Sequence, residues 1–334
     1  MQTFEGRKER TQTSMLTRAH LRLKVLQVLY ANLAASNKPG VEIEKDLRDA
    51  IDQVYGMYIA YLGIITQLLT RAEERIQAAR KKKLPTPEDL NPNLKWLKNP
   101  VLHQLYLHKE LPVLLKKYKI DFANEPILIR DMFKQVAASE AYKTYMSLPE
   151  GDYSTEKADL VKIIKTVVIN FAPFHHWLKQ RSVYNQFDDI DRICSMLLKT
   201  IKGFEERTAP ILPPYKEEYK DFFITLLRKT REHSSWIEEL LKKTVENWEI
   251  ERFAPLDILL LKMAITEAIE FPSIPLRVTM DEYIEFAKNY STEKSGAFVN
   301  GLLDSALKQL KEAGKIQKTL VAEKAEIEKE IKEN

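Results

Sequence analysis

The chain has 334 residues, of which 44% are hydrophobic and 30% charged, a balance that predicts a folded protein rather than a disordered one. Its 9 glycines and single cysteine, Cys194, argue against glycine-rich phosphate loops, an intrachain disulfide and a thiolate-rich metal site. The net charge is only +4, and because the sequence has neither an apolar leader segment nor a run of about 20 apolar residues, we expect a cytoplasmic protein.

The first predicted helix runs from about Met15 to about Ala35. Its apolar residues recur at spacings of three and four, which places them on one face: Leu16, Ala19, Leu23, Leu26, Tyr30 and Leu33. Residues 1–24 hold six basic and two acidic residues, an excess equal to the net charge of the whole protein. Basic residues in a first turn oppose the helix dipole, but a phosphate would meet those cations and the free N–H groups together. The basic start therefore predicts either a polyanion contact or a solvated face.

Helical patterns also cover the middle of the chain. A long pattern runs from about Val41 to Lys83, and a loop with four prolines follows at 84–100. Shorter helical patterns follow at about 101–119, 125–147, 154–180, 186–208, 216–230 and 232–249. Because no segment alternates in the manner of a strand, the sequence predicts an all-α fold.

Helix boundaries are sharper near the C-terminus. Pro255 begins a helix that is apolar nearly all round and is therefore expected to be buried at the centre of the fold. Thr279 to Glu282 has the form of a capping box and predicts a helix start. A last core helix is expected at roughly 295–312. It contains Asn300 and Gly301. Because an interior glycine costs about 1 kcal/mol relative to alanine, we expect close backbone packing at Gly301, and Asn300 is expected to be either a buried, hydrogen-bonded amide or a ligand contact.

Three segments, in this order, resemble the NusB family of transcription antitermination factors. RAHLRLKVLQVLY (18–30) is similar to the opening helix of that family. NWEIERFAPLDILLLKMAITEAIEF (247–271) resembles a later family segment, with Lys262 in place of the usual arginine. The run 274–304 matches the family pattern almost end to end, through Pro275, Val278, Glu282, Ala287, Lys288, Phe298, Val299, Asn300, Gly301, Leu303 and Asp304.

The resemblance implies an all-α fold with a NusB-like helical bundle as its core. It covers about 17–36 and 216–310, and the residues between these two stretches have no counterpart in the family. We therefore expect an additional helical lobe, inserted after the first helix. The expected parts are a basic N-terminal arm with the first core helix at 1–37, the inserted lobe at 38–212, the core at 213–312 and a charged helical tail at 313–334.

The resemblance also implies a function and a set of contacts. NusB-type proteins bind single-stranded boxA RNA of ribosomal RNA operons together with NusE, a small-subunit ribosomal protein, in the antitermination complex of RNA polymerase. The implied role is therefore RNA binding without catalysis, cofactor or metal. The RNA contacts that it implies are Arg18, His20, Arg22, Lys24, Lys288, Lys294 and Phe298. Asp257 matches an acidic position on the NusE-facing side.

Some of these assignments have simpler alternatives. Phe298 could stack on a base or belong to the core, and Asp257 could contact NusE or only complement a helix dipole. NusB-like domains also occur in ribosomal RNA cytosine methyltransferases, a role that would require a Rossmann-like domain after Asp304, where about 30 residues follow. A helical scaffold that acts through the insertion is a further alternative. The resemblance leaves monomer and homodimer open.

Overall fold

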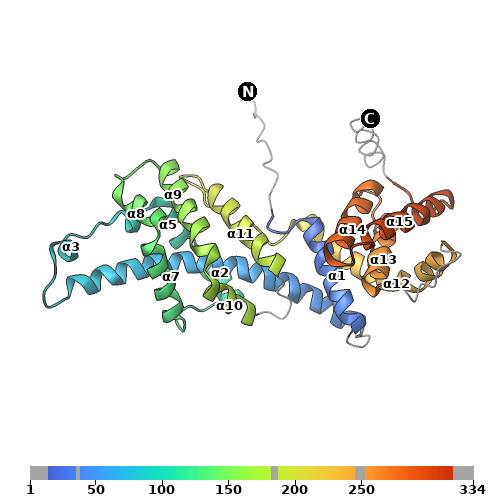
Figure 1. Ribbon diagram of the computed structural model, residues 1–334, viewed down its shortest axis with the longest axis horizontal. Helices are drawn as coiled ribbons and strands as arrows, with labels where there is room; N and C mark the ends of the chain where they lie inside the picture. Colours follow the sequence, from blue (N-terminus) through green and yellow to red (C-terminus); the bar gives the residue numbers. More distant parts are fainter. Residues whose placement is uncertain (1–13, 35–37, 182–186, 245–252, 319–334) are drawn as a thin grey trace, which may run out of the picture. The chain divides into compact units, whose positions relative to one another are not determined.

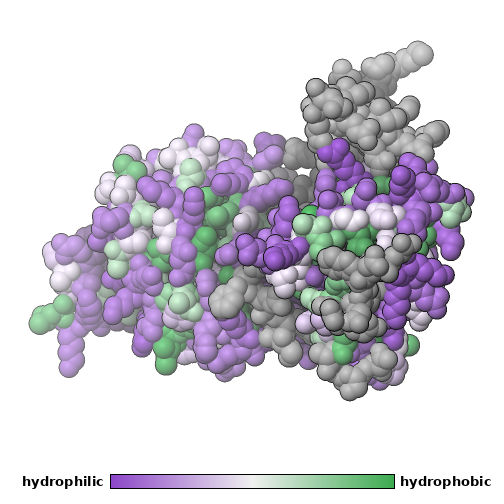
Figure 2. Space-filling model, turned by 45° about the vertical axis from the view of Figure 1, so that its right-hand side comes forward, coloured by the Kyte–Doolittle hydropathy of each residue, from purple (hydrophilic) through white to green (hydrophobic). Residues whose placement is uncertain are grey.

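The computed structural model describes residues 14–34, 38–181, 187–244 and 253–318. Every regular element in these ranges is a helix, and an isolated bridge between Glu205 and Thr208 is the only β pairing there. The all-α prediction is thus confirmed. None of the described helices is long and apolar enough to cross a membrane. Most of the surface visible in Figure 2 is hydrophilic, with apolar residues in small patches.

The chain divides into two compact units. Unit 1 comprises residues 51–214 together with Ser14 and Met15, and unit 2 comprises residues 16–50 and the residues from 215 onward. The long helix α2, Gly40–Arg80, has its first residues in unit 2 and the rest in unit 1. Its bounds agree with the prediction of one long helix from about Val41 to Lys83.

Unit 1 is built around α2, in which every residue from Val54 to Thr66 is buried. Gly63 permits close packing there, since a Cβ at this position would lie 2.6 Å from Leu115 and 2.9 Å from Phe122. The other helices of this unit are α3 (Pro87–Leu90), α4 (Lys95–Lys98), α5 (Pro100–Tyr106), α6 (Glu110–Lys117), α7 (Pro126–Ala138), α8 (Glu140–Ser147), α9 (Tyr153–Thr166), α10 (Ala172–Gln180) and α11 (Phe187–Lys202).

In unit 2 the helices pack around α13, Pro255–Glu270, which contacts the four other α-helices of this unit (Figure 1). These neighbours are α1 (Arg18–Ala34), α12 (Lys220–Thr244), α14 (Leu276–Tyr290) and α15 (Ser295–Glu312). Leu259, Leu260 and Leu261 are at most 5% exposed, which shows that α13 is buried on several sides. The prediction of a central helix that begins at Pro255 is confirmed.

Three details of unit 2 differ from the sequence predictions. α12 is one continuous helix, whereas two were expected, because no glycine or proline interrupts it. α14 begins at Leu276, so Thr279 does not cap a helix; its buried Oγ1 donates to Glu267 Oε1 at 2.9 Å. Asn300 and Gly301 are exposed, and a Cβ on Gly301 would meet nothing within 4 Å. The expected close packing at Gly301 and the expected burial of Asn300 are therefore wrong.

Several residues on which the sequence predictions rest lie outside the described residues. These include the basic residues Arg7, Lys8 and Arg10, the matched Trp248 and Arg252, and most of the charged tail. In the tail, residues 313–318 follow the end of α15, and Gly314 there adopts a φ of +66°. A glycine with positive φ directly after a helix is a common way for the helix to end.

Candidate functional site

The turn between α14 and α15 brings together several of the residues that the sequence singled out. Ser295 Oγ, at the start of α15, donates to Asp257 Oδ2 at 2.7 Å, and the backbone N–H of Thr292 donates to Ser295 Oγ at 3.1 Å. The Thr292 hydroxyl lies 2.7 Å from the same Oγ. These bonds tie the turn to the first turn of α13, so they fix the N-terminus of α15 in place.

Two lysines flank this N-terminus. Lys294, the last residue before α15, is exposed, and Lys288 in the last turn of α14 has 60% of its side chain exposed. The stem of Lys288 lies against the helix start, because a Cβ on Gly296 would be only 2.7 Å from Lys288 Cγ. The ammonium of Lys288 is 3.7 Å from Glu285, a surface pair that water screens. An anion at the start of α15 would meet both lysines and free backbone N–H groups.

Phe298 lies one turn into α15 and is half-buried. Its ring packs against Phe253, with centroids 4.3 Å apart and planes tilted by 38°. One part of the ring therefore supports the fold while another part faces solvent. The geometry is compatible with both roles considered for Phe298, and stacking on a base would use the exposed part.

Asp257 does not lie on a surface where a protein partner could reach it. The residue is 5% exposed, and its carboxylate accepts the hydrogen bond from Ser295 beneath the turn. Its other oxygen, Oδ1, is buried without a hydrogen-bond partner among the described residues. The expected role as a direct NusE contact is therefore replaced by a structural one: Asp257 holds the turn that presents the two lysines.

The start of α1 forms a second group. The Arg18 guanidinium lies 5.1 Å from the ring centroid of Tyr219, and the Lys216 ammonium lies 5.7 Å from the same centroid. His20 Nδ1 accepts a hydrogen bond from the backbone N–H of Thr17 at 3.1 Å, so this imidazole caps the helix start. The sequence analysis missed Tyr219 and Lys216, although an aromatic residue within the charged run KEEYK (216–220) was a usable signal.

Arg22 was expected on this basic face but is buried in an ion pair. Its Nε and NH2 groups donate to the two carboxylate oxygens of Glu267, at 2.6 and 2.8 Å. The hydroxyls of Thr279 and Tyr283 also donate to Glu267. Burial lowers the pKa of Arg22, but hydrogen bonding and charge from Glu267 outweigh it, so the pKa is raised and the group stays charged. A guanidinium that is 2% exposed and hydrogen-bonded at two points to Glu267 is not available to RNA phosphate.

Lys24 is also removed from the expected RNA surface. It is 1% exposed, and its Nζ donates to Gln27 Oε1 at 3.0 Å. Every residue from Leu21 to Leu26 is buried, so this stretch of α1 has no solvated side. The apolar spacing predicts a helix with one solvated face, but α1 is enclosed all round between Leu21 and Leu26.

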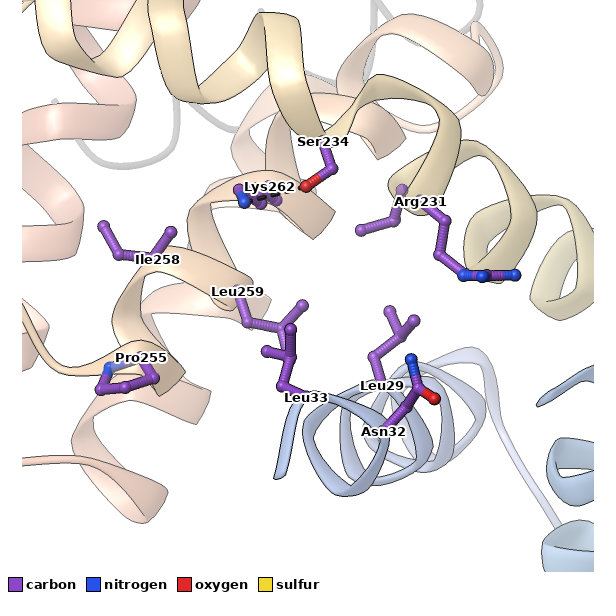
Figure 3. Close-up of a pocket in the computed structure, with 10 residues that line it drawn as sticks. Leu29, Asn32, Leu33, Arg231, Ser234, Pro255, Ile258, Leu259 and Lys262 are labelled. Carbon is purple, nitrogen blue, oxygen red and sulfur yellow. Dashed lines mark hydrogen bonds between the residues drawn. The ribbon is translucent and has the colours of Figure 1, made fainter. Parts of the chain in front are cut away.

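A cavity of about 310 Å³ lies among α1, α12 and α13 of unit 2. Leu29 and Leu33 of α1 rise toward it, and Leu259 of α13 and Ser234 of α12 lie at its other sides (Figure 3). Leu33 is 59% exposed, unusually so for a leucine beside a cavity. Lys262 Nζ donates to Ser234 Oγ and to Glu238 Oε2, both at 2.9 Å. The cavity thus combines apolar walls with a charged rim, as protein-binding surfaces often do.

Comparisons with known proteins match this part of the chain. A family model described as NusB family matches residues 192–308. The chain is 44% identical over 100 residues to the transcription antitermination protein NusB of Salinibacter ruber, an alignment that covers 30% of this chain and 62% of that protein. It is 36% identical over 107 residues to the NusB of Natranaerobius thermophilus, which covers 31% of this chain and 77% of that protein.

A third relative aligns over a longer part of the chain. The NusB of Thermodesulfovibrio yellowstonii is 35% identical over 127 residues, which covers 36% of this chain and 80% of that protein. These alignments leave about two thirds of the chain without a matched counterpart, and the chain spans less than two thirds of the Salinibacter ruber protein. No solved structure matches the chain.

Proposed function

This chain belongs to the NusB family, and from that premise we propose that it is an RNA-binding factor of transcription antitermination. The observation that carries the proposal is the pair of exposed lysines, Lys288 and Lys294, at a helix N-terminus that a buried hydrogen bond from Ser295 to Asp257 holds in place. Fixed cations beside free N–H groups suit the phosphate of an RNA strand.

The proposed ligand is boxA-like single-stranded RNA of ribosomal RNA operons. Lys288 and Lys294 hold the RNA backbone, and the exposed part of the Phe298 ring stacks on an unpaired base. Arg18 and the ring of Tyr219 offer the RNA a second contact of the same kind, a cation for a phosphate beside an aromatic ring for a base. His20 lies beside it in the first turn of α1.

The second proposed partner is NusE, the small-subunit ribosomal protein. We propose that NusE binds at the cavity among α1, α12 and α13, because Leu29, Leu33 and Leu259 can hold an apolar side chain of the partner. Leu33 is exposed there, whereas the buried Asp257 is out of a partner's reach. RNA and NusE bound together would reinforce one another by joint occupancy, within a complex on RNA polymerase. We propose that the protein acts in the cytoplasm and by binding RNA and NusE, as its likeness to NusB proteins implies.

The partner site is tested with Leu33→Glu. A charge placed against the apolar wall should weaken NusE binding by roughly tenfold or more, since anchors in such pockets carry most of the affinity. The matched control is Val278→Glu, which introduces the same charge at an exposed residue of α14 in the same unit. Titration of labelled NusE into each full-length variant measures the affinities. Equal NusE affinity of the two variants would remove the cavity from the proposal.

A further inference from the structure

Unit 1 contains a cavity of about 630 Å³, where the second half of α2 meets α4, α7 and α8. One aromatic side chain from each of the three shorter helices lines it: Trp96, Phe133 and Tyr142. The rings of Trp96 and Tyr142 have centroids 5.2 Å apart and are tilted by 59°. A cavity of several hundred cubic ångströms with aromatic walls has the size and character of a small-ligand site.

Two polar side chains that line this cavity, Tyr142 and Arg75, have no hydrogen-bond or ion-pair partner among the described residues. Trp96 forms part of the wall with its ring, and its indole Nε1–H is buried behind that wall without an acceptor among the described residues. The Tyr142 hydroxyl makes no hydrogen bond, and Arg75 makes no ion pair, within the part of the chain that the structure describes. Burial raises the pKa of Tyr142 to about 12 and the nearby positive charge of Arg75 lowers it, so the two groups lie close together. The half-buried hydroxyl of Tyr142 and the exposed guanidinium of Arg75 are therefore available to a ligand at this cavity.

The rim of the cavity carries acids as well as donors. Glu88 and Asp89 line it, and Asp89 accepts hydrogen bonds from the Thr86 backbone and from Lys82 Nζ. A simple anion would be repelled by these carboxylates. The polar edge of a nucleobase carries donors and acceptors side by side, so it could satisfy the Tyr142 hydroxyl and a carboxylate together.

Positive charge continues beyond the cavity. The end of α2 carries the basic run Arg80–Lys83, all of whose residues are exposed. Lys82 is paired with Asp89, which leaves Arg80, Lys81 and Lys83 without an ion pair among the described residues. A strand whose base lay in the cavity could therefore run its phosphates over Arg75 and this run.

We propose that this cavity of unit 1 binds one nucleotide of an unpaired RNA strand, with the base against the aromatic wall. Arg75 and the basic run Arg80–Lys83 hold the flanking phosphates, the ring of Trp96 forms part of the wall, and the Tyr142 hydroxyl donates to the base. The site lies outside the segment that matches the NusB family, at 192–308, and it does not rest on the function proposed for unit 2. The inserted lobe would then have its own function, as a second binding site for single-stranded RNA.

The test uses the full-length chain carrying Lys288→Glu and Lys294→Glu, so that the surface proposed in unit 2 is weakened and the remaining binding reports on unit 1. A fluorescently labelled single-stranded RNA of mixed sequence is titrated, and its anisotropy gives the affinity. Arg75→Gln and Tyr142→Phe remove one donor each. The matched control is Arg71→Gln, which removes the same charge one helical turn earlier, from an arginine that pairs with Glu74 and does not line the cavity.

We expect Arg75→Gln and Tyr142→Phe each to weaken RNA binding by roughly tenfold, and Arg71→Gln to change it by less than about twofold. Circular dichroism of each variant confirms that the helices are retained. Equal losses in Arg71→Gln and Arg75→Gln would indicate diffuse charge attraction and overturn the proposal. Unchanged RNA affinity in every variant would also overturn it, and binding of a glutamate-rich peptide that Arg75→Gln abolishes would assign the cavity to a protein ligand instead.

The two proposals fail separately in this design. If wild type and the Lys288→Glu/Lys294→Glu protein bind the RNA equally well, the surface of unit 2 is wrong, while the comparison of Arg75→Gln with Arg71→Gln still decides the site in unit 1.

Discussion

Two arginines one turn apart on α1 have different roles. Arg22 forms a buried, two-point ion pair with Glu267, and the guanidinium of Arg18 lies over the ring of Tyr219 at the start of the helix. Breaking a buried pair leaves an uncompensated charge inside the protein, which typically costs about 3–5 kcal/mol. Loss of a half-exposed side chain costs far less.

The first prediction follows from this contrast. Arg22→Gln should destabilise unit 2 by roughly 3–5 kcal/mol, and Arg18→Gln should change its stability by less than about 0.5 kcal/mol while weakening RNA binding. Hydrogen exchange of peptides from α13 and α14 measures the first effect. Similar protection in the two variants would show that the pair with Glu267 contributes little.

The sequence identified the residue types of the candidate site better than it identified their surroundings. Lys288, Lys294 and Phe298 do gather at the start of α15, as their clustering in the run 274–304 suggested. From the sequence alone, Arg22 and Lys24 are expected on a solvated basic face, because the sequence does not show that other parts of the fold enclose α1 between Leu21 and Leu26. For the same reason the sequence could not reveal that Asp257 lies beneath a turn formed 38 residues later.

At the scale of elements, α15 carries a glycine that packing does not require. Gly301 is exposed in the middle of the helix, and a Cβ there would meet no atom within 4 Å. An interior glycine lowers helix stability by about 1 kcal/mol relative to alanine, and in this structure no contact offsets that cost. The physical reason that the sequence analysis gave for Gly301, close backbone packing, is therefore absent.

Gly301→Ala should consequently stabilise unit 2 by about 0.5–1 kcal/mol. Thermal unfolding measures the change, and Ala297→Gly on the exposed side of the same helix is the reverse substitution, with an expected loss of similar size. A destabilised Gly301→Ala protein would mean that another chain or ligand approaches the backbone at this residue.

At the scale of the whole molecule, buried tyrosines make stability depend on alkaline pH. Burial raises the pKa of Tyr58 and of Tyr142, both in unit 1, from the ordinary 10.0 to about 12. Because the unfolded chain releases these protons at lower pH than the folded one, their contribution to stability is complete below pH 10 and is lost as the pH rises from 10 to 12.

Helix content should therefore hold up to about pH 10 and fall between pH 10 and 12. Circular dichroism and tyrosinate absorbance, recorded in one titration, test this. Tyrosines that all ionise near pH 10 while the helices persist would contradict the burial of these two side chains.

The division of the chain was only partly readable from its sequence. The three family-like segments contain residues of α1, α13, α14 and α15, all in unit 2, and the stretch expected as an insertion contains most of unit 1. The cavity of unit 1 could not be foreseen, because Arg75, Trp96 and Tyr142 come from three separate helices whose meeting depends on tertiary packing.

The central claim is that single-stranded RNA binds unit 2 at the start of α15, and the affinity of the full-length chain for boxA RNA tests it most directly. The measurement compares wild type with Lys288→Glu/Lys294→Glu and with Lys308→Glu/Lys311→Glu, which makes the same charge change at exposed residues near the other end of α15. The first variant should bind roughly 10- to 100-fold more weakly and depend less steeply on salt, and the second should stay within about threefold of wild type. Equal affinities of the two variants would contradict the claim.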